Sequence, residues 1–268
     1  MTAGTAARLA TLAGQVARLS TCDALPLSPL ALAERAGITP DPWQAAVLVS
    51  TASRVLLNCS RQSGKSTIAA IRAVHTAMYE PGALVLLLSP SLRQSGELFK
   101  KVLATYRAAG CPVAAEAETR LTLELENGAR IVSLPGKEST IRGFSAVRLL
   151  LVDKASRVDT DTYHSIRPML AVSGGTLIAM STPFGKVGWW ADAWHSREDW
   201  QRVTVPASDC ARIPASFLEE ERRAMPEWNY RQEYECAFED AEGAVFRHED
   251  LLAALSPDVA PLFEVSHA

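Results

Sequence analysis

The sequence predicts an α/β fold in which a mainly parallel sheet is covered by helices on both faces. Two observations carry this prediction: apolar runs of strand length recur along the chain, and segments with a helical pattern separate them. Strands buried on both faces have this continuous apolar character, and the helices form the crossovers that parallel strands need. The expected strands cover residues 54–58, 83–89, 147–153 and 175–182, with an edge strand over 201–206.

The segments between these strands have two further patterns. Residues 120–134 alternate apolar and polar side chains around Asn127-Gly128, which predicts a β-hairpin. Helical patterns cover residues 66–79, 91–110 and 161–170.

Small helical appendages are expected at both ends of the sheet-forming region. The spacing of Leu9, Leu12, Val16 and Leu19 predicts an amphipathic helix over 6–20, and further helices are expected over 28–37 and from Pro42. The charged segment 214–240 is predicted to be helical with a break at Pro226. We therefore expect an N-terminal helical segment (1–40), a core (41–212), a helical closing segment or lid (213–246) and a tail or linker (247–268).

Composition and charge exclude several classes of protein. The 268 residues carry a formal net charge of −3, so an overall basic character gives no argument for nucleic-acid binding. The five cysteines are scattered without metal-binding spacing, which favours reduced thiols in a cytosol. The longest apolar runs are far too short to span a bilayer, and the N-terminus has no apolar secretory core. We expect a soluble, intracellular protein with no membrane partner.

The stretch LLNCSRQSGKSTIAA (56–70) has the features of a phosphate-binding loop. A buried strand leads into Gly64-Lys65-Ser66-Thr67 and a helix follows, so unpaired N–H groups of the first helical turn point at an anion. In the G-x-x-x-x-G-K-[ST] pattern the lysine contacts the β- and γ-phosphates and the hydroxyl of Ser66 ligates Mg²⁺. The pattern is met except at its first position, where Cys59 replaces glycine. Nucleotide binding is the favoured interpretation over an incidental surface turn.

A second acidic strand end supplies the expected partner of this loop. RLLLVDKAS places Asp153 directly after a buried run, where its carboxylate would hold the water shell of Mg²⁺. Many P-loop ATPases have a glutamate next, which polarises the attacking water. This chain has Lys154 there, and a charged lysine has no lone pair with which to accept a proton.

In combination and order, these motifs resemble the ATPase domain of the large terminase subunit, the DNA-packaging motor of tailed bacteriophages. CSRQSGKST (59–67) is similar to its variant Walker A, in which the first glycine is often absent, and LLLVDKAS to its Walker B. PDPWQ (40–44) resembles its adenine-recognition segment, and MSTPFGKVG (180–188) its coupling motif. STIRGFSA (139–146) resembles the segment with an arginine finger, and EWNYRQEYECAFED (227–240) its closing helical segment. The resemblance covers about residues 40 to 246 and implies a RecA/ASCE-like P-loop NTPase fold.

The resemblance also implies the activity and the partners. The chain is expected to bind ATP with Mg²⁺ and, as a hydrolase and molecular motor in viral genome packaging, to move double-stranded DNA into a procapsid in the host cell cytoplasm. The implied partners are DNA, other copies of the chain in a ring, the portal or procapsid, and the small terminase subunit. The family carries a C-terminal nuclease domain and this chain stops before one, so we expect a fragment or a motor subunit without its nuclease.

The resemblance assigns roles to individual residues, and alternatives remain open for several. Arg61 contacts the γ-phosphate or pairs with a neighbouring carboxylate; Arg142 is an arginine finger offered to a neighbouring subunit or an exposed loop arginine. Because Lys154 replaces the catalytic glutamate, we expect hydrolysis to be deficient. A helicase-like or recombination ATPase and a nucleotide-binding pseudo-ATPase assembly subunit are the alternative functions. The expected ATP-binding residues are Trp43, Gln44, Ser60, Arg61, Gln62, Ser63, Gly64, Lys65, Ser66 and Thr67; the metal ligands are Ser66 and, through water, Asp153; the coupling residues are Ser181 and Thr182; the catalytic positions are Lys154, Arg61 and Arg142.

Overall fold

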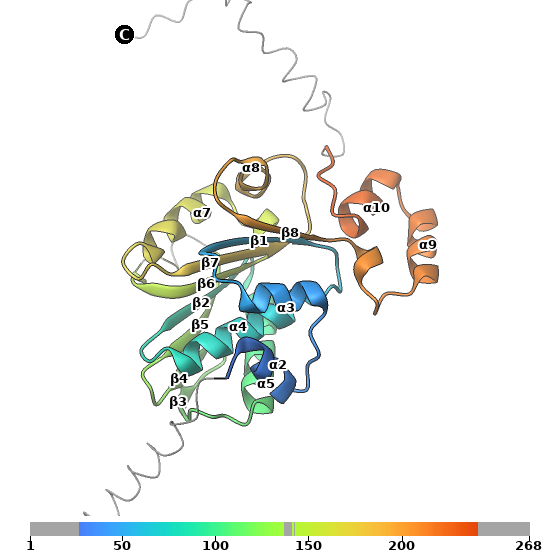
Figure 1. The fold of residues 1–268 in the computed structure, drawn as a ribbon. Coiled ribbons are helices and arrows are strands. Elements are labelled where there is room, and N and C mark those ends of the chain that lie inside the picture. The colour runs from blue at the N-terminus through green and yellow to red at the C-terminus, as the bar shows by residue number, and fades with distance from the viewer. Residues whose placement is uncertain (1–26, 137–140, 142, 241–268) are drawn as a thin grey trace, which may run out of the picture.

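The computed structural model describes residues 27–136, 141 and 143–240, and in this part of the chain one sheet of eight strands organises the fold (Figure 1). The strand order is β3-β4-β5-β2-β6-β7-β1-β8, and the pairs from β5 to β8 are all parallel. The predicted mainly parallel α/β fold is confirmed. The strands are β1 (Arg54–Cys59), β2 (Leu84–Ser89), β3 (Ala115–Glu118), β4 (Thr122–Leu125), β5 (Arg130–Pro135), β6 (Val147–Asp153), β7 (Thr176–Ser181) and β8 (Gln201–Val205).

Helices cover both faces of the sheet, as Figure 1 shows. On one face, alternate strand residues such as Val55 and Leu57 pack against α2, α3, α4 and α5; on the other, residues such as Leu56 and Leu150 pack against α7 and α8. Because both faces of the sheet are buried, the sequences of the strands are continuous apolar runs. The helices are α2 (Pro29–Arg35), α3 (Pro42–Val49), α4 (Lys65–Tyr79), α5 (Leu92–Ala108), α7 (Thr160–Ile166), α8 (Trp189–His195), α9 (Ala215–Ala224) and α10 (Glu227–Tyr234), with 3₁₀ turns at Ala155–Arg157, Arg167–Leu170 and Ala207–Asp209.

The antiparallel part of the sheet confirms the predicted hairpin and adds a strand to it. β4 pairs with β5 around the Asn127-Gly128 turn, and β5 joins the parallel sheet beside β2. β3 was not predicted because its sequence, AEAE, is exposed throughout and lacks β-branched and aromatic residues.

The predicted helix over 161–170 ends as an α-helix at Ile166 and continues as a 3₁₀ turn. Pro168 has no N–H with which to continue the α-helical ladder. The predicted helix over 6–20 lies outside the described residues.

Residues 214–240 form two helices that lie to one side of the sheet (orange and red in Figure 1). The predicted break at Pro226 separates α9 from α10. α9 buries none of its residues, whereas α10 buries Tyr230 and Gln232, and the Gln232 side chain accepts a hydrogen bond from the Gly185 N–H (3.2 Å). The division into an N-terminal segment, core, closing segment and tail stays a prediction.

The parallel arrangement brings the carboxyl ends of β1, β6 and β7 to the same edge of the sheet. Ligands of open α/β sheets bind at this edge, beyond the strand ends. The motifs singled out in the sequence follow these three strands. No helix of the described residues is long and apolar enough to cross a membrane.

Candidate nucleotide site

The loop between β1 and α4 has the backbone of a phosphate cradle. β1 ends at Cys59 and α4 begins at Lys65, with Gly64 between them at a φ of 91°. The positive φ favours glycine, and a Cβ at position 64 would lie 2.6 Å from Nε2 of Gln44, so a side chain there would displace the Gln44 amide. The buried Ser63 hydroxyl donates to the Ser60 carbonyl at 3.0 Å and closes the loop.

Lys65 lies at the floor of this loop. Its Nζ donates to the carbonyls of Cys59 (3.2 Å) and Ser60 (3.0 Å). Burial lowers the pKa of the Lys65 ammonium, and the charge of Lys154 lowers it further, while Asp153 opposes the shift. A buried ammonium held only by neutral carbonyls strongly favours an anionic ligand.

Two side chains from distant segments, Gln44 and Arg212, stabilise the loop by donating hydrogen bonds to the Ser63 carbonyl. Gln44 donates to the Ser63 carbonyl at 3.2 Å and accepts from the Asp41 N–H at 2.9 Å. Arg212 pairs with the Asp41 carboxylate through two bonds of 2.9 and 2.7 Å and also donates to the Ser63 carbonyl at 3.0 Å. Arg212 was not predicted, because the sequence around it carries no pattern that connects it to the phosphate loop.

The residues predicted to recognise the base lie behind the loop. Gln44 is buried and uses both ends of its amide within the protein, and Trp43 packs against the core. Neither lines the pocket, whose apolar lining comes instead from Ile213, Pro214 and Phe217. The base-contact roles of Trp43 and Gln44 stay predictions.

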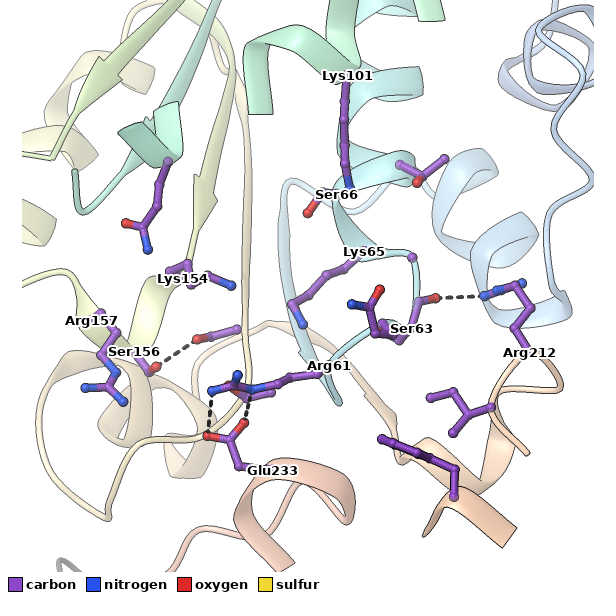
Figure 2. A pocket seen from close by; sticks show the side chains of 18 of the residues that line it. Arg61, Ser63, Lys65, Ser66, Lys101, Lys154, Ser156, Arg157, Arg212 and Glu233 are labelled. Carbon is purple, nitrogen blue, oxygen red and sulfur yellow. Dashed lines mark hydrogen bonds and ion pairs between the residues drawn. The ribbon is translucent and has the colours of Figure 1, made fainter. Parts of the chain in front are cut away.

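At the end of β6, Asp153 and Lys154 face different surroundings. Asp153 is buried, and its Oδ1 has no hydrogen-bond partner among the described residues. Lys154 has a left-handed backbone (φ 58°, ψ 41°), which is uncommon for a residue with a side chain. Its exposed side chain lines the pocket and extends toward the side where Lys65 lies (Figure 2).

β7 brings the predicted coupling residues to the same pocket. Ser181 is paired in register with Asn58 of β1, and its buried hydroxyl shares a hydrogen bond of 2.7 Å with that of Ser156. Thr182 lines the pocket next to it. This position beside the phosphate loop is compatible with the coupling role, which stays a prediction.

Arg61 forms an ion pair with Glu233 of α10, at 2.5 Å from Nε and 3.3 Å from Nη2 (Figure 2). The hydrogen bond to Glu233 raises the pKa of the Arg61 guanidinium. The structure therefore contains the second of the two alternatives for Arg61, pairing with a carboxylate, while contact with a γ-phosphate stays a prediction. Arg142 lies outside the described residues.

A pocket of about 1110 Å³ is lined by the phosphate loop, Lys154, Thr182 and neighbouring side chains, but not by Asp153. Its lining in the described part of the chain includes six cationic side chains and the single carboxylate of Glu233, so the pocket is suited to a polyanion. Arg157, whose guanidinium lies 3.2 Å above the ring of Phe184, and Lys101 of α5 were not predicted. The six cations are Arg61, Lys65, Lys101, Lys154, Arg157 and Arg212.

The donor set for a divalent cation fits Mg²⁺. Ser66 lines the pocket at the start of α4, and the unpaired carboxylate oxygen of Asp153 is a hard oxygen ligand of the kind that Mg²⁺ prefers. The family glutamate is replaced by Lys154, which adds a cation beside this donor set.

Sequence comparisons show that this chain is similar to large terminase subunits. The large terminase subunits of Thermus virus P23-45 and Escherichia phage T5 are each 27% identical to this chain; each alignment covers 83% of the chain and 53% and 52% of the respective proteins. The chain therefore spans about half the length of these curated relatives.

The solved structures show the same fold. The ATPase domain of the Thermus phage P74-26 large terminase matches with a TM-score of 0.68 at 23% identity, covering 77% of this chain and 97% of that domain. The large terminase of another thermophilic bacteriophage, in complex with ADP, matches with a TM-score of 0.62 at 11% identity, over 74% of this chain and 54% of that one. The predicted P-loop NTPase fold is confirmed. Residues 56–253 match the family model described as terminase large subunit, T4likevirus-type, N-terminal, and this chain belongs to that family.

Proposed function

We propose that this chain is the ATP-binding motor domain of a phage genome-packaging terminase. The observation that carries the proposal is Lys65 at the floor of the loop between β1 and α4, in a pocket rich in cations. Solved relatives support it, since the large terminase of the thermophilic bacteriophage has structures in complex with ADP and with ATP-γ-S.

The pocket has two chemically different ends, which orient the nucleotide. The phosphates lie over the loop, where Lys65 and the N–H groups at the start of α4 face them. The base lies toward Ile213, Pro214 and Phe217; the Phe217 ring has 42% of its surface exposed, and its edge-to-face contact with Tyr234 orients it. Ser66 and Asp153 would hold Mg²⁺, which when bound neutralises phosphate charge.

Hydrolysis is expected to be deficient. Lys154 occupies the position after Asp153 where a water-polarising glutamate is needed, and its ammonium cannot accept the proton. Arg61, Ser181 and Thr182 would report the state of the γ-phosphate to the closing helices, since Arg61 already joins the loop to α10. Arg142 would complete a neighbouring site in a ring of subunits.

The partners follow from the same proposal. Translocation requires double-stranded DNA, further copies of this chain, a portal or procapsid and a small terminase subunit, all in the host cell cytoplasm. The lysine at position 154, where a catalytic glutamate is expected, supports a second candidate function: a pseudo-ATPase subunit that uses bound nucleotide only for assembly.

The test measures ATP binding and phosphate release for this chain and for Lys154→Glu, each with and without double-stranded DNA. We expect both proteins to bind ATP and only Lys154→Glu to release phosphate, with stimulation by DNA. Nucleotide-dependent oligomerisation without phosphate release in both proteins would select the assembly function. Failure of both proteins to bind ATP would reject the proposal, and rapid hydrolysis by the unchanged chain would reject the role assigned to position 154.

A further inference from the structure

The cations of the pocket divide into paired and unpaired groups. Arg61 is neutralised by Glu233, and Arg212 by Asp41. The other four, Lys65, Lys101, Lys154 and Arg157, have no carboxylate partner within hydrogen-bonding distance among the described residues.

The Lys154 side chain forms no hydrogen bond or ion pair with another described residue, and its position in the pocket is set by its backbone. The left-handed conformation at φ 58° is costly for a residue with a Cβ, and such strain occurs at functional sites. The 3₁₀ turn Ala155–Arg157 follows directly, with the Arg157 N–H bonded to the Lys154 carbonyl at 2.8 Å, and fixes the conformation. The Lys154 side chain therefore extends into the pocket on the side where Lys65 lies (Figure 2), and the two like charges repel each other.

Such a repulsion is relieved by an anion between the two ammonium groups. A nucleoside triphosphate carries about four negative charges at neutral pH, part of which a divalent cation neutralises in related sites. Here four cationic side chains without a carboxylate partner among the described residues already line the pocket. An additional divalent cation therefore contributes less to the free energy of nucleotide binding.

We propose that the Lys154 ammonium supplies to the terminal phosphate the positive charge that Mg²⁺ supplies in related sites, so that this chain binds ATP with little dependence on Mg²⁺. The proposal rests on the nucleotide site proposed above. It makes Lys154 a phosphate-binding group as well as the replacement of a catalytic one. By linkage, bound ATP would also raise the affinity of the Ser66 and Asp153 donor set for Mg²⁺ only weakly.

The experiment is a calorimetric titration with ATP and with ADP, each in excess MgCl₂ and in excess EDTA. For the unchanged chain we expect ATP affinities that differ by no more than about threefold between the two conditions. For Lys154→Glu we expect EDTA to weaken ATP binding ~10-fold or more, a change of about 1.4 kcal/mol. Lys154→Gln keeps the length and removes the charge, so its dependence on Mg²⁺ should lie between these, with a smaller effect on ADP than on ATP.

Lys100→Gln is the matched control, because Lys100 is the neighbour of Lys101 on α5, pairs with Glu97 and does not line the nucleotide pocket. It should leave all four affinities unchanged. Equal dependence on Mg²⁺ in the unchanged chain and in Lys154→Glu would overturn the inference while leaving the nucleotide site standing. Absence of ATP binding to folded protein in every condition would overturn the site itself.

Discussion

The two sides of the pocket are built in opposite ways. On the side of the phosphate loop, Lys65 and Ser63 are hydrogen-bonded within the loop, and Gln44 and Arg212 brace it from behind. On the side of β6, Asp153 has a buried oxygen without a partner in the described chain, and the exposed Lys154, which has no carboxylate partner there either, lines the pocket.

This difference separates binding from chemistry. The bonded side is preorganised, so an anion can replace the carbonyl contacts of Lys65 without rebuilding the loop. Unpaired buried charge and left-handed backbone cost stability and are typical of functional positions. A substitution on the β6 side can therefore change catalysis while the binding side remains intact, which is the situation expected of Lys154.

The largest effect is expected when Lys65, the cation on the phosphate-loop side of the pocket, is replaced. Lys65→Met should weaken ATP binding by ~10–100-fold, because a hydrogen bond to a charged group contributes about 1.5–3 kcal/mol. Isothermal titration calorimetry measures the affinity. Thermal unfolding should change little, since the methionine fills the space of a buried cation whose burial is itself costly. Unchanged ATP affinity would show that the β6 side binds the phosphates by itself.

A smaller effect is expected from filling the turn of the loop. Gly64→Ala should lower the free energy of unfolding by ~1–2 kcal/mol because of its positive φ, and should weaken ATP binding because the new Cβ displaces Gln44. Urea denaturation and an ATP titration measure the two effects. Gly37→Ala is the control, since Gly37 has a φ of 74° but nothing within 4 Å of an added Cβ. It should cost stability and leave ATP binding unchanged; equal effects on binding would reject the role of the Gln44 contact.

The smallest effect concerns the brace behind the loop. In a double-mutant cycle of Arg212→Gln and Asp41→Asn, the coupling free energy should be about 0.5–1 kcal/mol, because both side chains are partly exposed. Chemical denaturation of the four proteins measures it. Each single variant should also weaken ATP binding a few-fold, since Arg212 holds the Ser63 carbonyl. A coupling of zero would mean that the ion pair does not stabilise the loop.

Much of the fold and part of the site could be predicted from local sequence. Apolar runs located β1, β2, β6 and β7, the segment 201–206 was predicted as an edge strand, and the alternating pattern around Asn127-Gly128 located the hairpin of β4 and β5. The phosphate-loop pattern located Gly64, Lys65 and Ser66, with the helix starting at Lys65, one residue before the predicted start, and the end of the apolar run located Asp153 at the end of β6. These features succeed because strand burial, helix initiation and turn conformation depend on residues close together in the chain.

Only the tertiary structure decided which distant side chains complete the site. Arg61 and Glu233 are 172 residues apart, and Arg212 and Asp41 are 171 apart, so no local pattern connects them. Lys101 of α5 and Arg157 of the turn after β6 line the same pocket although they are far apart in the chain, so only the fold brings them together. The sequence by itself determined the parts and their chemistry, including the substitution at Lys154. The packing of the sheet determined that four of the cations lining the pocket have no carboxylate partner in the described part of the chain, because charge pairing depends on distances across the fold rather than along the chain.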